Sequence, residues 1–169
     1  MKQTFFITST VLKWIRIFSR PELADIVIQS LSFMIENSRI RLHGYVLMPN
    51  HLHLILTIID PYTLSDFMRD FHKYTSQQIF KILRNENTGF LANFEVGKND
   101  RKHQLWQETH AAKSVESAKF YFQKLAYIHN NPLNRRWQLC ERPEQYPYSS
   151  ATDYILKTAG PLKLDKIEC

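Results

Sequence analysis

Two long apolar runs joined by one Pro-Asn dipeptide constrain the fold of this 169-residue chain most strongly. Residues 40–48 (IRLHGYVLM) and 51–59 (HLHLILTII) are rich in β-branched and large aliphatic side chains, and only Pro49 and Asn50 separate them. Two such runs on either side of a tight turn predict a β-hairpin. We therefore expect an antiparallel pair of strands at 40–59.

Other patterns predict elements before and after this hairpin. Aromatic and β-branched residues favour strands, apolar residues at i, i+3 and i+4 favour helices, and a polar stretch with glycine favours a loop. In chain order we expect a strand at 5–11, a helix at 21–34, the hairpin, a helix from 63 to about 85, a mobile loop at 85–103, a short strand at 104–111, a helix at 114–131 that Pro132 ends, and a short helix with irregular wrapping.

The order β-α-β-β-α-β-α predicts the fold class. It matches a ferredoxin-like split βαβ arrangement in the α+β class, with an antiparallel sheet and helices packed on one face. We expect a single domain over residues 1–169, with a tail at 155–169 that is mobile. A fold of this kind does not by itself specify any chemistry.

Composition excludes several classes of protein. Hydrophobic residues make up 44% of the chain, which favours a compact globular domain over a disordered one. The two cysteines, Cys140 and Cys169, are too few for a disulfide framework or a cysteine zinc site. No apolar run approaches the ~20 residues of a membrane helix, so we expect a cytoplasmic protein with no membrane partner. The net charge of +6 permits nucleic-acid binding without demonstrating it.

The first candidate site is the string Met48-Pro49-Asn50-His51-Leu52-His53. Residues i and i+2 of a strand point to the same side, so His51 and His53 project together. Two neutral imidazoles side by side can share one divalent metal ion. The alternative is that both are polar residues on a solvated strand face.

The second candidate site is the string YIHNNP at 127–132. At 3.6 residues per turn, Tyr127 and Asn131 face the same way, off the main apolar stripe of their helix. His129 falls on that stripe, and we expect it to be packed. The alternative is that Tyr127 packs against the sheet and Asn131 only ends the helix.

Together the two strings suggest a reaction. A metal ion held by two histidines and one amide oxygen can withdraw charge from a phosphodiester. A tyrosine on a neighbouring helix can then attack phosphorus in line and form a covalent phosphotyrosine link.

Four strings resemble a known family. GYVLMPNHLHLIL (44–56), LWQETHAAK (105–113), YIHNNP (127–132) and YPYSSATDY (146–154) are similar to those of the single-tyrosine HUH transposases, in particular the REP-associated tyrosine transposases. The resemblance runs from the first strand to about Tyr154. It implies a metal-binding histidine pair at His51 and His53, a nucleophile at Tyr127 and a third metal ligand at Asn131.

The same resemblance implies an activity and its requirements. Members of this family cleave single-stranded DNA near small hairpins, form a 5′-phosphotyrosine, leave a 3′-hydroxyl and use Mg²⁺ or Mn²⁺. Branches of the family differ in oligomeric state, so both a monomer and a homodimer stay open. Tyr121, six residues before Tyr127, is an alternative nucleophile that lacks the Asn-Pro context.

Single-stranded DNA binding combines cations with aromatic rings on which bases stack. Lys124, Arg135 and Arg136 are the candidate phosphate contacts, because they lie on or just after the helix of Tyr127. Loop cations and two tryptophans are secondary candidates, namely Lys98, Arg101, Lys102, Trp106 and Trp137. Two rival functions remain, a non-catalytic nucleic-acid-binding module of the same fold and a replication or conjugation initiator with the same chemistry.

Overall fold

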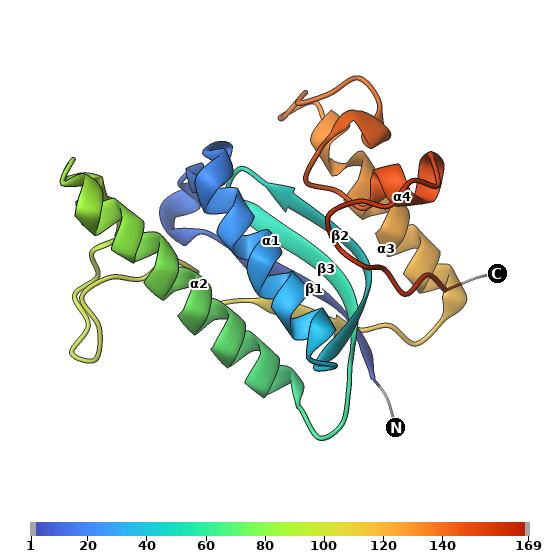
Figure 1. Ribbon diagram of the computed structural model, residues 1–169, viewed down its shortest axis with the longest axis horizontal. Coiled ribbons are helices and arrows are strands. Elements are labelled where there is room, and N and C mark those ends of the chain that lie inside the picture. Colours follow the sequence, from blue (N-terminus) through green and yellow to red (C-terminus); the bar gives the residue numbers. More distant parts are fainter. Residues whose placement is uncertain (1–2, 168–169) are drawn as a thin grey trace.

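The structure is a computed structural model that describes residues 3–167. Four antiparallel strands form one sheet in the order β2-β3-β1-β4, namely β1 (Thr4–Thr10), β2 (Ile40–Met48), β3 (His51–Ile58) and β4 (Ala111–Ser114) (Figure 1). The helices are α1 (Pro21–Glu36), α2 (Leu64–Glu86), α3 (Ala118–Asn130) and α4 (Ala151–Ile155). This confirms the α+β class and the antiparallel sheet.

Helices cover both faces of the sheet. In Figure 1, α1 and α2 lie in front of the strands and α3 lies behind them. Alternate residues of each strand accordingly belong to two separate cores, so that Leu54 and Leu56 pack on the side of α1 and α2 while Ile55 packs on the side of α3. The helix layer expected on one face is therefore joined by α3 on the other.

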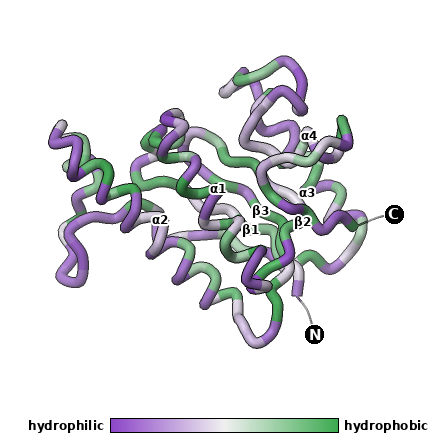
Figure 2. The backbone as a smooth tube through the Cα atoms, in the orientation of Figure 1, coloured by the Kyte–Doolittle hydropathy of each residue, from purple (hydrophilic) through white to green (hydrophobic). Residues whose placement is uncertain are grey.

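This double coverage explains the unbroken apolar runs of the hairpin. Every residue of β3 is buried, and so is every residue of β2 except Arg41. A strand covered on both sides reads as a continuous hydrophobic run rather than as an alternating one. Figure 2 shows this as largely hydrophobic colouring along the strands, while hydrophilic turns alternate with hydrophobic ones along α2.

Gly44 allows α3 to approach β2 closely. A Cβ atom at this position would lie 2.7 Å from Leu125 Cδ1 of α3, which is closer than real contacts allow. The register of β2 against β3 also shifts between Leu42 and Gly44. The missing side chain therefore sets how near the helix of Tyr127 lies to the hairpin.

The strand expected at 104–111 is wrong in its position. The strand found in this part of the chain is β4, Ala111–Ser114, an exposed edge strand that pairs with the side of β1 opposite β3. Residues Leu105 and Trp106 are buried instead in the core beneath α1 and α2. Their apolar character reflected burial, and their backbone follows the end of β1 through Leu12 N–H to Leu105 C=O at 2.7 Å.

Two further boundaries differ from the sequence-based expectation. Helix α3 begins after Ser117, whose side chain accepts a hydrogen bond from the Phe120 N–H, rather than at Ser114. Within the expected loop at 85–103, residues Phe90–Phe94 form a 3-10 helix whose Phe94 is buried.

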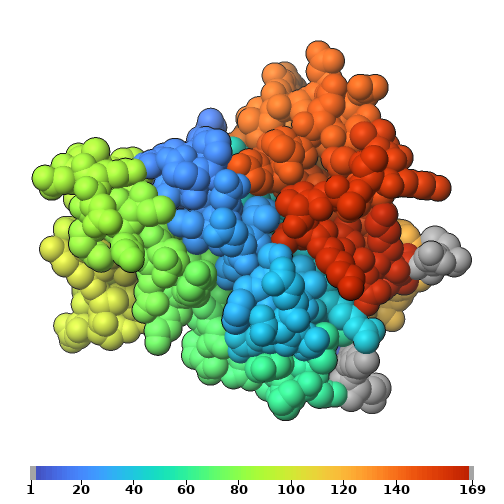
Figure 3. Space-filling model, in the orientation of Figure 1, coloured from blue at the N-terminus to red at the C-terminus, as the bar shows by residue number. Residues whose placement is uncertain are grey.

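The C-terminal segment covers the free edge of β2. The Leu47 N–H donates to the Tyr148 carbonyl at 2.8 Å, and the Ser150 N–H donates to the Tyr45 carbonyl at 3.0 Å. Figure 3 shows this segment, in red, beside α1. Leu162 is buried in the core, although the mobility expected for 155–169 stays a prediction.

Cys169 lies outside the described residues. Within residues 3–167, no helix combines the length and apolar character needed to cross a membrane.

Candidate metal and tyrosine site

His51 and His53 lie side by side on the α3 face of β3. Their ring centroids are 4.8 Å apart, and both residues are buried. His51 opposes Thr10 of β1, and His53 opposes Thr8. The alternative in which both histidines lie on a solvated strand face is therefore wrong, because α3 and the segment that follows it cover them.

The hydrogen bonds of His51 fix which ring nitrogen faces the site. Its Nδ1 lies 2.7 Å from Asn50 Oδ1, and Asn50 Nδ2 donates to the Trp14 carbonyl at 3.2 Å. An amide oxygen only accepts, so Nδ1 of His51 carries the proton and Nε2 keeps a lone pair. This is the tautomer in which Nε2 can bind a metal ion.

His53 also has a polar side chain beside its Nδ1, although this partner is a hydroxyl that can donate or accept. Its Nδ1 lies 2.8 Å from Thr8 Oγ1, and its Nε2 is buried with no hydrogen-bond partner among residues 3–167. A buried polar atom without a partner is costly and is often explained by an ion. The Phe6 ring stacks on the imidazole at 5.5 Å and holds its plane.

Burial keeps both imidazoles neutral. It lowers the pKa of His51 to about 4. The charge of Arg136 also lowers this pKa, whereas the Asn131 side chain raises it. Burial lowers the pKa of His53 to about 3, helped by His51 and Lys124. Neutral imidazole is the form that binds a metal ion, so neither residue must lose a proton first.

Tyr127 lies beside His53. The two ring centroids are 5.2 Å apart, and the tyrosine is 49% exposed. Its ring also meets the edge of Phe6 at 6.2 Å, and the Lys124 ammonium lies 5.5 Å from its centroid. A solvent-accessible phenol is placed where an approaching phosphate can reach it.

Asn131 completes the cluster one helical turn after Tyr127. It continues the helical backbone at φ −56° and ψ −43°, is buried, and lies close to the His51 imidazole. The structure thus brings together the four residues that the sequence singled out. No three His, Cys, Asp or Glu side chains among residues 3–167 are grouped so that they could hold a metal ion. The Asn131 amide oxygen could serve as a third donor beside the two imidazoles. Two imidazole nitrogens and an amide oxygen fit a divalent ion whose remaining positions are filled by water or phosphate.

The alternative tyrosine lies elsewhere. Tyr121 is 2% exposed, and its hydroxyl is 3.0 Å from that of Tyr154. Its ring neighbours His43 rather than the histidine pair. His129 is packed as expected, with Nε2 at 2.9 Å from Ser150 Oγ, and burial lowers its pKa to about 4.

The candidate DNA contacts divide into two groups. Lys124, Arg135 and Arg136 form no ion pair with any residue in 3–167. Lys124 lies beside the Tyr127 ring, and Arg136 lies beside the Trp137 ring. The loop cations are paired with acids, Lys98 with Glu108, Arg101 with Asp100 and Lys102 with Glu95. Ion pairing makes the second group the poorer candidates for phosphate.

The two tryptophans also separate. Trp106 is buried, and its Nε1 donates to Thr75 Oγ1 at 2.9 Å, so it belongs to the core. Trp137 lies with its ring centroid 5.9 Å from that of His51. Of these two tryptophans, Trp137 is the one that borders the site.

Sequence reasoning missed several neighbours of the site. Thr8, Asn50 and Arg16 all contact its residues, and none was singled out. Asn50 precedes His51 directly, so its position was a usable signal. Thr8 reaches His53 only through the strand register, which one sequence does not contain.

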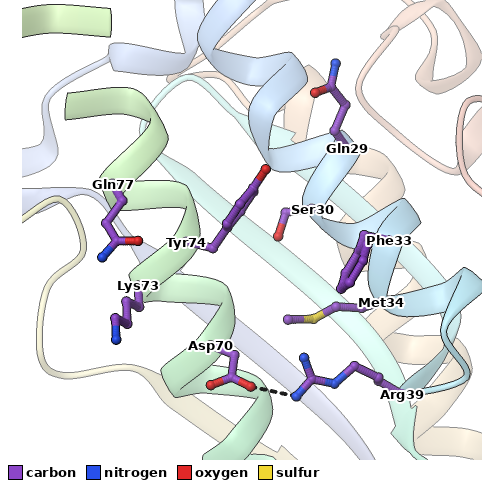
Figure 4. Close-up of a pocket in the computed structure, with 9 residues that line it drawn as sticks. All are labelled: Gln29, Ser30, Phe33, Met34, Arg39, Asp70, Lys73, Tyr74 and Gln77. Carbon is purple, nitrogen blue, oxygen red and sulfur yellow. Dashed lines mark hydrogen bonds and ion pairs between the residues drawn. The ribbon is translucent and has the colours of Figure 1, made fainter. Parts of the chain in front are cut away.

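A second hollow lies on the other face of the sheet. It is a cleft of about 390 Å³ between α1 and α2, and Figure 4 shows Phe33 and Tyr74 facing it from opposite helices above the ion pair of Arg39 with Asp70. It shares no residue with the histidine site. The cleft is therefore a feature separate from the candidate site.

The comparisons with known proteins show the family of the chain. The family described as "Transposase IS200 like" matches residues 14–131. This covers more than half of the chain, including the histidine pair, Tyr127 and Asn131. The chain belongs to the IS200-like transposase family, which places it among DNA-processing proteins.

Individual relatives are more distant. A protein of Haemophilus influenzae described as uncharacterized is 32% identical over 103 residues, which cover 56% of each chain, so the match spans about half the length of that relative. A REP-associated tyrosine transposase bound to a REP hairpin matches with a TM-score of 0.69 at 14% identity, over 100% of this chain and 93% of that one. The structure of a candidate transposase from Deinococcus radiodurans matches with a TM-score of 0.51 at 18% identity. This match covers 77% of this chain and 91% of that one. At these identities the two structures show a shared fold.

Proposed function

We propose that this chain is a metal-dependent endonuclease and strand transferase for single-stranded DNA, with Tyr127 as nucleophile. The observation that carries the proposal is the exposed Tyr127 ring 5.2 Å from His53, whose Nε2 is buried with no hydrogen-bond partner among residues 3–167. His51, His53 and Asn131 would hold Mg²⁺ or Mn²⁺. When bound, such an ion would supply charge withdrawal from the phosphate.

The reaction is a displacement at phosphorus. The Tyr127 Oη–P bond forms as the P–O3′ bond breaks, and the phenol proton ends on the departing 3′ oxygen. The products are a 5′-phosphotyrosine and a free 3′-hydroxyl. Lys124 stabilises the negative charge that develops on the phenol, because its ammonium lies 5.5 Å from the ring. Attack by another 3′-hydroxyl on the phosphotyrosine reverses the step and joins strands.

The proposed substrate is a single strand that carries a hairpin. Support comes from the neighbouring structure with the higher TM-score, which is bound to a REP hairpin. Lys124, Arg135 and Arg136 are the proposed phosphate contacts, because they lie on or just after the helix of Tyr127 and form no ion pair with an acid in residues 3–167.

The test is formation of a covalent adduct that resists denaturant. Wild-type protein with Mn²⁺ and a pool of hairpin-bearing single strands, with randomised flanks, is expected to give a protein–DNA band. The Tyr127→Phe variant should give none while still binding DNA, and His51→Ala should lose metal-dependent cleavage. Tyr121→Phe is the matched control and should retain the adduct. Binding by wild-type protein with no adduct across the whole pool would favour the non-catalytic module instead.

A further inference from the structure

The segment that follows β1 lies beside the histidine site and carries an unusual surface. Trp14 is 54% exposed, and the exposed Arg16 places its guanidinium carbon 4.9 Å from the centroid of the Trp137 ring. Arg136 approaches the same ring at 5.9 Å. Neither arginine forms an ion pair with any residue in 3–167. We call Trp14, Arg16, Arg136 and Trp137 the tryptophan platform.

The platform is tied firmly to the turn that precedes the histidines. The Val11 N–H donates to the Asn50 carbonyl at 2.9 Å, and Asn50 Nδ2 donates back to the Trp14 carbonyl at 3.2 Å. Lys13 and Trp14 adopt positive φ angles of 54° and 58°, which non-glycine residues rarely do. The backbone thus accepts strain to present Trp14 outward, and such strain is concentrated at functional positions.

Aromatic rings beside unpaired cations are the features that bind a single strand, and here Trp14 is exposed while Trp137 is half-buried. Bases stack on the rings whatever their sequence, and the guanidinium groups meet the phosphates. Such an arrangement is ill-suited to an apolar protein partner, because two unpaired guanidinium groups lie over the Trp137 ring. Charge and continuity with the histidine site both favour DNA.

The order of side chains gives this strand a direction. Tyr127 lies next to His53, the two imidazoles are 4.8 Å apart, and Trp137 lies next to His51 on the other side of the pair. In an in-line displacement, the attacking and leaving oxygens lie on opposite sides of phosphorus. A phosphate at the histidines attacked from the Tyr127 side therefore releases its 3′ oxygen toward Trp137.

We infer that the tryptophan platform binds the DNA segment on the 5′ side of the cleavage position, the segment that ends in the new 3′-hydroxyl. The inference rests on the proposed function for its polarity. The two products are then held differently, one covalently on Tyr127 and the other by stacking and charge on the platform. Holding the 3′-hydroxyl segment near the phosphotyrosine keeps it available for rejoining.

Binding is tested with full-length protein and 5′-fluorescein-labelled dT12 by fluorescence anisotropy. The double variant Trp14→Ala/Arg16→Ala is expected to raise the dissociation constant at least fivefold. The matched control is Lys73→Ala/Tyr74→Ala, which removes an exposed ring and a cation beside the cleft of Figure 4 and should change it less than twofold. Circular dichroism checks that each variant is folded, and Trp14→Phe should retain most of the affinity. No binding of dT12 by wild type, or equal affinity of the platform variant, would overturn the inference.

Polarity is tested by photocrosslinking on the Tyr127→Phe variant, which cannot cleave. A dT12 with 4-thiothymidine at its 3′ end should label the tryptic peptides of Trp14 or Trp137, residues 14–16 and 137–157. Labelling confined to residues 120–124 would contradict the proposed direction. Neither measurement depends on adduct formation, so a failure of the nuclease proposal and a failure of the platform give different results.

Discussion

Two small polar side chains decide how the histidines can act. Asn50 and Thr8 each engage the Nδ1 atom of one imidazole, at 2.7 Å for His51 and 2.8 Å for His53. Each contact leaves Nε2 as the available ligand atom. Outer contacts of this kind commonly change metal affinity 10–100-fold when removed.

Thr8→Val is therefore expected to weaken binding of Mn²⁺. Valine has nearly the same shape but no hydroxyl, so His53 loses the contact that orients its ring. The dissociation constant for Mn²⁺, measured by isothermal titration calorimetry, should rise about tenfold. Thr8→Ser keeps the hydroxyl and should stay near the wild-type value. Equal affinity of Thr8→Val and wild type would show that this hydroxyl does not position the ligand.

The main residues of the candidate site could be predicted from the sequence, but the side chains that contact them could not. The period of a strand places His51 with His53, and the period of a helix places Tyr127 with Asn131. Their roles stay predictions, but the four side chains do meet. Trp14 and Thr8 were not predicted, because their contacts depend on how β1 pairs with β3 and on the path of the chain after β1. No local sequence pattern encodes either feature.

At the scale of elements, the contact between α3 and β2 positions the tyrosine. Gly44 is the closest point, because a Cβ atom there would meet Leu125 Cδ1 at 2.7 Å. Helix α3 carries Tyr127 two residues after Leu125. A change in this packing therefore acts on both stability and the site.

Gly44→Ala is expected to destabilise the fold by about 1–3 kcal/mol, since extra volume in a packed core forces neighbours to move. Urea unfolding followed by circular dichroism measures the change. Gly97→Ala is the matched control, because a Cβ atom at Gly97 meets nothing within 4 Å, and it should change stability by less than about 0.5 kcal/mol. An unchanged midpoint for Gly44→Ala would mean that Leu125 moves aside freely.

The sequence predicted the types of the long elements well and one short element poorly. The hairpin and the helices at residues 21 and 63 carry strong periodic or apolar patterns, and the structure has them at nearly the expected bounds. The strand expected at 104–111 includes Leu105 and Trp106, which are buried in an irregular segment instead. Burial of an irregular segment produces the same apolar signal as a strand, so tertiary packing decided that case.

The whole molecule contains several buried neutral histidines away from the metal site. Burial lowers the pKa of His72 to about 3 and that of His129 to about 4, and it lowers the pKa of His43 as well. In the unfolded chain these groups titrate near pH 6.5. Below that pH the unfolded state binds protons that the folded state excludes.

Stability should therefore fall as the pH is lowered from 6.5 toward 4.5. The sign follows from linkage, because the state that binds more protons is favoured by acid. The free energy of unfolding is expected to drop by on the order of 5 kcal/mol over this window. Urea titrations at half-unit pH intervals measure it. A flat profile between pH 6.5 and 4.5 would show that these histidines are not held neutral.

The overall topology was predictable because the order of elements left few arrangements. A β-α-β-β-α-β order with an apolar hairpin leads to the observed sheet order β2-β3-β1-β4. The placement of α3 on the second face was not anticipated. It follows from residues such as Val46 and Ile55, whose burial on that side needs a covering helix.

The most direct measurement of the central claim is the position of the covalent link. Tyr121 and Tyr127 fall on different tryptic peptides, residues 120–124 and 125–135. Wild-type protein is incubated with Mn²⁺ and hairpin-bearing single strands, and the adduct is digested with nuclease and trypsin before mass spectrometry. The account predicts a nucleotide remnant on peptide 125–135, at Tyr127. A remnant on peptide 120–124, or an adduct that survives in Tyr127→Phe, would contradict it.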